Sequence, residues 1–361
     1  MNNTIKKNQH FVPQFYLKYF SLYNEKTSIG LYNIPSAKFI PSAPIKSQSA
    51  QKFFYGKDGK VEEWLSDVEN NMAPIFSNII SNQKLPEWSS AIHLKLIHFL
   101  IVLDLRNPVH KNEIEKGFEL FKEKLNRHNV DNSDSDIQKA FDSIDNDQLF
   151  NESLLEATSS IPYLIDLNFK LIRNTTSIPF IISDNPMVNY NQFLEHRNWK
   201  HSSHNGYGAI GRQIYFPLNH EYLIAFYDSG IYKIGNKKEK IVTIDSENEI
   251  HQLNILQYLN CNQNLYFNQL ASRDYIQNLV QEAEKYIKAN KPYSKVVPIL
   301  DKSTGNLKKN EEIITIGSSD AKINLTIAKI KMHSKSKGIK FDNHVVQLRP
   351  KVKQHIEVNG R

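Results

Sequence analysis

The order of helix-like and strand-like patterns limits the fold of this chain more than any other sequence feature. Helical patterns come first: apolar residues recur every three or four positions from Val61 to Ile80, and Ile92 to Leu105 is apolar on nearly every face. Strand-like apolar runs follow between Leu167 and Ile244. Segregated patterns of this kind predict an α+β fold, in which a helical N-terminal half packs on a mostly antiparallel sheet from the second half.

Shorter patterns add further elements. Alternating segments at Ile29–Ile34 and Lys38–Ile40, separated by a Pro-Ser pair, predict a hairpin near the N-terminus. Ser89 and Ser90 can cap the apolar helix that ends at Leu105. We also expect helices at 113–125, 150–161 and 266–287, and strands at 167–173, 178–182, 214–218, 222–227, 231–234 and 241–244.

The composition excludes several classes of protein. With 40% hydrophobic and 11% aromatic residues, the chain of 361 residues is too apolar to be disordered along its whole length. Cys261 is the single cysteine, which excludes an intramolecular disulfide and fits a reducing compartment. The start lacks the apolar core of a signal peptide, and the apolar stretch from Leu96 to Leu103 is too short to span a bilayer. We therefore expect a cytoplasmic protein with no membrane partner.

Positive charge gathers at the C-terminal end of the sequence. Met332–Arg361 holds seven Lys and Arg residues against two acidic ones, which is +5 of the net +7. The preceding segment 301–312, DKSTGNLKKNEE, has the composition of a linker. We predict a core domain over 1–300, a linker over 301–312 and a basic extension over 313–361. This extension could bind nucleic-acid phosphates, although charged chain ends are more often solvated surface.

The first candidate site is the block HFVPQFYLKYF, which begins at His10. If the block is extended, His10, Gln14 and Tyr16 project from one face. If Pro13 instead opens a helix, His10 sits just before the helix N-terminus, where backbone donors favour an anion. The alternative is that His10 is simply a structural hydrogen-bonding residue.

The second candidate site follows the apolar run PFII and consists of Ser183, Asp184 and Asn185, with Pro186 after them. Asp184 could hold a metal ion, orient a histidine or act as a base. Asn185 is pushed into an extended conformation because it precedes a proline. The alternative is an Asx-type turn that satisfies its own backbone.

Arg106 is the third candidate, at the end of the most apolar helix and directly before Asn107-Pro108. A guanidinium in or beside a core needs a carboxylate or a bound anion, because leaving it unpaired is costly. Glu69 on the preceding helix and Asp104 are the candidate partners. Arginine also suits phosphate binding, and a purely structural ion pair explains its position equally well.

A loop from Glu195 to Gly208 carries His196, His201 and His204. Three histidines could bind zinc, but their spacing matches no metal motif, and three solvated histidines are the simpler interpretation. The sequence contains no Walker loop, GxGxxG, HExxH or GxSxG motif. P-loop hydrolysis, dinucleotide redox chemistry, gluzincin proteolysis and the commonest serine hydrolase design therefore lose their usual support.

The block HFVPQFYLKYFS resembles the opening motif H-[YF]-V-P-Q-x-Y-L-x-x-F of the bacterial domain-of-unknown-function family 4238. Three further features resemble this family in the same order: the segment DVENNMAP with Glu69, the element Arg106-x-Pro108, and PFIISDNP. The resemblance covers about residues 5–290. It implies that the polar residues of the recurring motifs meet in one pocket, namely His10, Gln14, Tyr16, Glu69, Arg106, Ser183, Asp184 and Asn185.

These observations lead to the hypothesis of a hydrolase that acts on phosphodiester bonds of nucleic acid. His10, Asp184 and Glu69 would supply acid–base or metal-binding chemistry, with a divalent metal ion left open as a cofactor. Arg106 would bind the anionic substrate, helped by Gln14, Tyr16, Ser183 and Asn185. Analogy with other bacterial families suggests a role in phage defence or as a toxin. The alternative is a non-catalytic module that binds a small anionic ligand or a protein partner.

Overall fold

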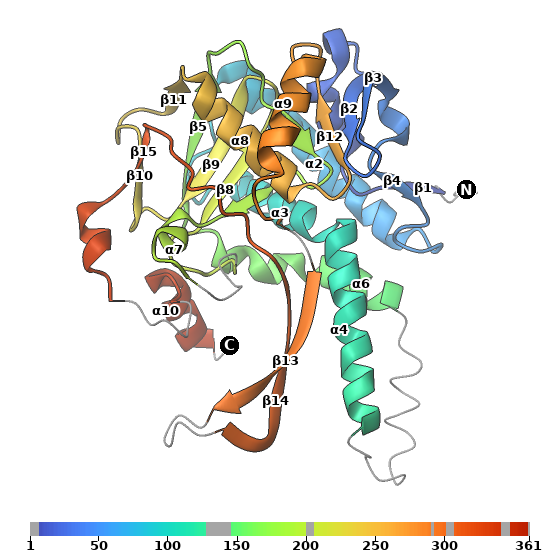
Figure 1. Cartoon of the computed structure of the whole chain (residues 1–361), viewed down its shortest axis with the longest axis vertical. Helices are drawn as coiled ribbons and strands as arrows, with labels where there is room; N and C mark the ends of the chain where they lie inside the picture. Colours follow the sequence, from blue (N-terminus) through green and yellow to red (C-terminus); the bar gives the residue numbers. More distant parts are fainter. Residues whose placement is uncertain are drawn as a thin grey trace.

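The structure, a computed structural model, describes residues 7–127, 146–199, 206–289, 292–300, 307–340 and 347–359. Three long helices precede residue 128, and the largest sheet is built entirely from residues after 167, so the predicted α+β class is confirmed (Figure 1). The helices are α1 (Gln14–Leu17), α2 (Lys60–Asn82), α3 (Ala91–Leu105), α4 (Pro108–Arg127), α6 (Asn146–Leu155), α7 (Gln192–His196), α8 (Glu247–Asn260), α9 (Arg273–Ala283) and α10 (Pro350–Asn359). Short 3₁₀ segments are η1 (Lys18–Phe20), η2 (Leu22–Asn24), η3 (Ile45–Ser47), η4 (Glu156–Tyr163) and η5 (Ser334–Gly338).

Two sheets form the centre of the molecule. The five-stranded sheet has the order β11-β5-β9-β8-β7, and only its β11–β5 pair is parallel. The four-stranded sheet has the order β3-β2-β12-β6 and is antiparallel throughout, which confirms the predicted hairpin as β2–β3. Their strands are β2 (Ser28–Asn33), β3 (Lys38–Pro44), β5 (Asn168–Asn174), β6 (Ile182–Ser183), β7 (Val188–Tyr190), β8 (Gln213–Pro217), β9 (Tyr222–Tyr227), β11 (Ile241–Ile244) and β12 (Asn264–Phe267).

Three two-stranded ladders complete the described strands, and all three are antiparallel. The first of them joins the N-terminal block to the segment before α2. The pairs are β1 (Asn8–His10) with β4 (Ala50–Lys52), β10 (Tyr232–Ile234) with β15 (Ile330–Met332), and β13 (Pro292–Leu300) with β14 (Leu307–Ser318).

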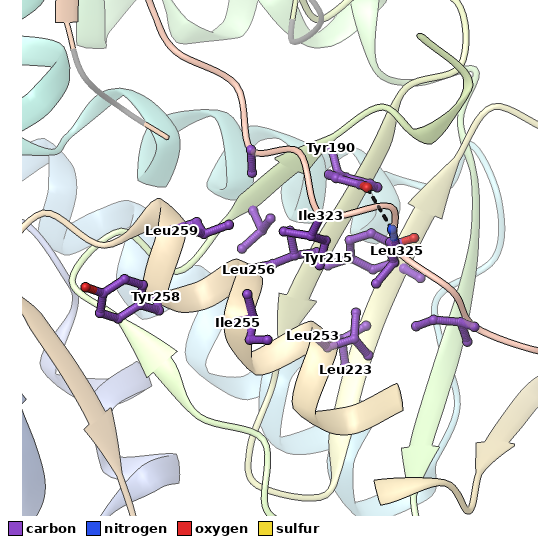
Figure 2. Packing of buried hydrophobic residues seen from close by; sticks show 14 of the residues in the cluster. Tyr190, Tyr215, Leu223, Leu253, Ile255, Leu256, Tyr258, Leu259, Ile323 and Leu325 are labelled. Atoms are coloured by element: carbon purple, nitrogen blue, oxygen red, sulfur yellow. Dashed lines mark hydrogen bonds between the residues drawn. The ribbon is translucent and has the colours of Figure 1, made fainter. Parts of the chain in front are cut away.

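Both faces of the five-stranded sheet are buried. Along β9, Leu223 and Ala225 belong to the hydrophobic cluster under α8 and α9, whereas Ile224 and Phe226 belong to the cluster under α2 and α3. Figure 2 shows Leu253 of α8 beside Leu223. Because both faces are covered, β9 and the part of β8 after Gln213 do not alternate between apolar and polar residues.

The two predicted helices of the first half form as expected. Along α2, Leu65, Met72 and Ile79 are buried on one stripe. At the start of α3, the Ser90 hydroxyl oxygen accepts a hydrogen bond from the backbone N–H of His93 at 3.2 Å, which is the predicted cap. The middle of α3 is buried on nearly all sides, so this helix runs through the core. Among the described residues, no helix combines the length and apolarity needed to cross a membrane.

Three predictions for the second half need correction. Residues 266–287 were predicted as one helix, but the segment begins in strand β12 and is helical only in α9. The predicted strand at 178–182 is reduced to the two residues of β6. Helix α8 was not predicted at all. The run NLYF of β12 is short and wholly apolar, and periodicity cannot distinguish such a run from a helical segment.

The segment after β14 packs on the core. Ile323, Leu325 and Ile327 belong to the cluster under α8, and the backbone N–H of Leu325 donates to the Tyr190 hydroxyl at 3.1 Å (Figure 2). Residues 307–312, predicted as part of a linker, lie in strand β14, and residues 301–306 are outside the described residues. The segment from 319 to 332 is therefore part of the folded core and does not behave as a separate tail.

Arg349 fixes the last described segment to the middle of the chain. Its guanidinium is buried, and its Nη2 atom lies 2.8 Å from the Asp166 Oδ1 atom. The Nη1 atom donates to the backbone carbonyls of Tyr207 at 2.8 Å and Ala209 at 2.9 Å. A cation counted in the predicted nucleic-acid-binding extension thus has a structural partner.

Candidate functional site

Three of the sequence motifs meet at a small polar cavity beside β1, which we call the His10 pocket. His10 and Gln14 come from the N-terminal block, Glu69 from α2 and Arg106 from the residue after α3. The cavity has a volume of about 120 Å³. Four of the eight predicted site residues therefore converge. The wall is completed by Asn8, Glu62, Leu65 and Ser66.

His10 reaches the pocket because β1 ends there and α1 begins at Gln14, directly after Pro13. The structure thus follows the helical alternative for this block. The Nε2 atom of His10 lies 3.1 Å from the backbone carbonyl oxygen of Lys46. A carbonyl oxygen only accepts hydrogen bonds, so this contact assigns the proton to Nε2. Nδ1 is then the ring nitrogen that does not contact this carbonyl.

Arg106 is 1% exposed and is held from three sides. Its Nη1 atom lies 2.9 Å from the Glu69 Oε1 atom, and its Nη2 atom donates to the backbone carbonyl of His10 at 2.6 Å. The Nε atom donates to the Tyr55 hydroxyl at 3.3 Å. Of the two predicted partners, Glu69 makes the ion pair, whereas Asp104 accepts a hydrogen bond from Tyr207. Arg106 therefore ties the end of β1 to α2.

The charge of Arg106 and the proton of Tyr55 are both stabilised by this arrangement. Burial alone would lower the pKa of Arg106, but Tyr55 and Glu69 outweigh that effect and raise it. Burial raises the pKa of Tyr55 to about 12. The hydroxyl of Tyr55 thus stays protonated at neutral pH, and it donates to the carbonyl of His10 at 3.1 Å. Two donors fix the backbone of His10.

Glu62 is a pocket residue that the sequence reasoning missed. It lies on α2 ahead of Ser66 and Glu69, and all three line the cavity. The spacing of four and then three residues places them on one face of a helix. This spacing on a predicted helix is the sequence signal that could have identified Glu62 as a site residue.

Tyr16 differs from what the family resemblance implies, namely that it lies in one pocket with His10. Its side chain is 0% exposed, and its hydroxyl donates to the backbone carbonyl of Pro217 at 2.7 Å. The ring stacks on Phe216, with 5.1 Å between ring centroids. Tyr16 therefore packs in the core and does not line the His10 pocket.

Asp184 does not line the His10 pocket either; it lies in a buried turn after β6, which we call the Asp184 turn. Its Oδ1 atom accepts from the backbone N–H of Asn262 at 2.8 Å. Its Oδ2 atom accepts from the backbone N–H groups of Gln263 at 2.8 Å and Asn264 at 3.0 Å. Burial raises the pKa of Asp184, although these donors act against it. The carboxylate thus satisfies the backbone of another segment, not its own as in the predicted Asx-type turn.

Ser183 and Asn185 are bonded within the same turn. The Ser183 hydroxyl donates to the Asn185 carbonyl at 2.7 Å, and the backbone N–H of Ser183 donates to the Gln257 side chain at 2.9 Å. Asn260 donates to the Asn185 carbonyl at 2.6 Å. Gln257 and Asn260 lie on α8, so the turn is attached to that helix. The motif closes a packing contact and contributes nothing to the wall of the His10 pocket.

The described residues offer no ligand set for the divalent ion considered above. Over those residues, no group of three or more His, Cys, Asp and Glu side chains is arranged to hold a metal ion. Of the histidine loop, His196 ends α7, while His201 and His204 lie outside the described residues.

A comparison with known families finds one match for this chain. Residues 8–270 match the family described as "Protein of unknown function (DUF4238)". The matched range contains both the His10 pocket and the Asp184 turn. No curated protein and no solved structure matches the chain. Because the match covers more than half of the sequence, the chain belongs to the DUF4238 family.

Proposed function

We propose that the protein is a hydrolase that cleaves phosphodiester bonds at the His10 pocket. The observation that carries this proposal is the convergence of an imidazole, two carboxylates and a guanidinium, from three separate chain segments, on one cavity of about 120 Å³. These groups together can transfer protons and stabilise developing charge. The cavity is large enough for one phosphate-sized group.

The contacts of each residue suggest its role. His10 would exchange a proton through Nδ1, because Nε2 contacts the Lys46 carbonyl. We assign the general-base role to Glu62, which lines the cavity, and treat Glu69 and Arg106, which form an ion pair, as positioning residues. Asp184 has no part in this mechanism, because its carboxylate is buried and bonded elsewhere.

The competing function is non-catalytic binding of a small anionic ligand or a protein partner. Two carboxylates and one guanidinium give the pocket a formal charge of −1 while His10 is neutral. An anion would therefore bind best when His10 is protonated, and its affinity should fall at alkaline pH. Turnover distinguishes the two functions, because only the hydrolase converts its ligand.

The cellular part of the proposal is an intracellular activity against nucleic acid, in phage defence or as a toxin. The intracellular setting is supported by the single, buried cysteine, Cys261, which fits a reducing compartment such as the cytoplasm.

The test is hydrolysis of bis(4-nitrophenyl) phosphate and of a labelled oligonucleotide, with and without added magnesium. The variants His10→Ala and Glu62→Gln should lower turnover by about a hundredfold or more, with unchanged unfolding midpoints. His355→Ala on α10 is the matched histidine control and should leave turnover unchanged. If the wild-type protein cleaves neither substrate but binds inorganic phosphate in a His10-dependent way, the binding function replaces the hydrolase.

A further inference from the structure

A second concentration of positive surface charge, besides the C-terminal segment, lies at the N-terminal end of the fold. Residues 7–57 contain seven lysines and one acidic residue, Glu25, which is a net +6 of the total +7. All seven lysines are exposed, and within the described part of the chain none of them forms an ion pair. They are Lys7, Lys18, Lys26, Lys38, Lys46, Lys52 and Lys57.

Three of these lysines lie in or next to β1, η3 and β4, the segments on one side of the His10 pocket, and we call that side the strand wall. Lys52 of β4 is paired in register with Asn8, which lines the cavity. The backbone carbonyl of Lys46 in η3 contacts His10 Nε2 at 3.1 Å and accepts from the Asn8 side chain at 3.3 Å. The carbonyl of Lys7 accepts from the backbone N–H of Phe53, the residue after β4, at 2.9 Å. Figure 1 shows β1 and β4 together at the edge of the molecule.

The opposite wall of the pocket, formed by α2, is acidic. Glu62 and Glu69 line the cavity, and Glu63 and Asp67 lie on the same helix. A small anion inside the cavity would meet these carboxylates and would be too short to reach several lysines. A chain of phosphates could instead lie along the strand wall, with one phosphate at His10. The charge pattern therefore favours a polymer over a small ligand.

We propose that the strand wall, formed by β1, η3 and β4, binds the sugar–phosphate backbone of a nucleic-acid strand. This inference rests on the proposed function, because it supplies that function with its substrate. It also assigns the phosphate-binding surface to the N-terminal part of the chain and not to the C-terminal segment. There Arg349 is paired with Asp166, Lys351 lies over the Trp88 ring at 5.0 Å, and Lys353 lies 3.8 Å from Glu357.

The experiment measures binding of a labelled single-stranded DNA by fluorescence anisotropy over a range of salt concentrations. The protein carries His10→Ala, so that cleavage does not interfere. Adding Lys7→Glu, Lys46→Glu and Lys52→Glu should weaken binding at least tenfold and lower the salt slope by roughly 2, at about 0.7 per phosphate contact. The matched control reverses three exposed lysines of the C-terminal segment, Lys335, Lys337 and Lys340, and should retain most of the affinity.

Equal weakening by both triple variants would overturn the inference, because net charge alone would then explain binding. Binding of the wild-type protein to anionic phospholipid vesicles, with no binding to DNA, would also overturn it. If the charge-reversed protein fails to fold, glutamine at the same three positions gives a neutral variant with the same expected direction.

Hydrolysis tests the proposed function, and DNA binding tests the strand wall, so the two can fail independently. If the protein hydrolyses the small diester but its DNA binding does not depend on the strand wall, this inference is rejected and the hydrolase function is retained. DNA binding that depends on the strand wall, without hydrolysis of any substrate, would keep the surface and reject the hydrolase.

Discussion

The His10 pocket and the Asp184 turn are two polar regions of the same family domain, and they differ in how far their polar groups are satisfied. Around His10, side chains from three segments face a cavity of about 120 Å³. At Asp184, each carboxylate oxygen accepts two hydrogen bonds, three from backbone N–H groups and one from the Cys261 thiol at 3.4 Å. Little bonding capacity remains at Asp184 for a ligand.

This difference shows that polar residues in recurring motifs can have two separate purposes. The Asp184 turn fastens the segment after α8 to the end of β6, so its polar groups determine stability. The His10 pocket places similar groups around a space, where a substrate would contact them under the proposed function. Substitutions that separate stability from activity test this distinction.

The largest effect is expected at the Asp184 turn. Asp184→Ala leaves three buried backbone donors unsatisfied, so the free energy of unfolding should fall by about 3–5 kcal/mol. Urea unfolding followed by circular dichroism measures it. Asp184→Asn keeps one acceptor and should lose less, which gives a usable value if the alanine variant does not fold. A stable Asp184→Ala variant without hydrolytic activity would place Asp184 in the active site instead.

Two further histidines sharpen the comparison, because His93 is buried and His98 is half-buried, while His10 lines a cavity. Burial lowers the pKa of His93 to about 4 and also lowers the pKa of His98. A histidine with a lowered folded-state pKa stabilises the protein less as pH falls, because the unfolded chain takes up protons first. The loss for His93 should begin near pH 6.5 and reach up to about 3 kcal/mol near pH 4.

This pH dependence is measured by urea unfolding between about pH 7 and pH 4.5, in wild type and in His93→Leu. Buried carboxylates such as Asp184 have raised pKa values and become easier to bury as they protonate, so they oppose the trend. The difference between the two proteins isolates the contribution of His93. A His93→Leu variant whose pH profile runs parallel to that of the wild type would contradict the assignment.

A smaller effect is expected for Tyr16, which shares the N-terminal block with His10 but points into the core. Tyr16→Phe removes the hydrogen bond to the Pro217 carbonyl and should cost about 1 kcal/mol of stability, with hydrolysis unchanged. Thermal or urea unfolding measures the change. Tyr23→Phe is the control, because Tyr23 is 70% exposed and its hydroxyl can bond to water. If Tyr16→Phe loses hydrolysis while its stability is unchanged, Tyr16 belongs to the active site after all.

The smallest effect on stability is expected at His10 itself. Its ring is partly exposed, and its Nε2 contact with the Lys46 carbonyl lies at the surface. His10→Gln should therefore change the free energy of unfolding by less than about 1 kcal/mol while it lowers hydrolysis about a hundredfold. Paired measurements of unfolding and turnover on one preparation check both values. Strong destabilisation by His10→Gln would mean that the pocket, like the Asp184 turn, is a structural device.

Much of the first half of the fold could be predicted from the sequence, because its elements are long and periodic. The stripe along α2 and the Ser90 cap of α3 are local signals that tertiary packing reinforces. Helix α8 gave no such signal, because Asn254, Gln257 and Asn260 are polar yet buried. Their side chains bond to the segment from 179 to 187, a contact that no local pattern encodes.

The candidate site was predicted in the same uneven way. The Arg106–Glu69 pair could be anticipated, because a guanidinium at the end of an apolar helix needs a carboxylate from the next layer. The separation of Asp184 from His10 could not, because it depends on the backbone donors of residues 262–264, which are remote in sequence. Sequence motifs list polar residues, whereas only the fold determines which donors reach them.

The Arg349–Asp166 pair has a consequence for how the chain folds during synthesis. Asp166 leaves the ribosome long before Arg349, since 183 residues separate them, and Leu325 likewise arrives late to meet Tyr190. Until the final segment emerges, the Asp166 carboxylate and the Tyr190 hydroxyl of the nascent chain lack these two partners. Contacts of such long sequence separation slow folding, so closure of the domain is a step that follows translation of residue 349.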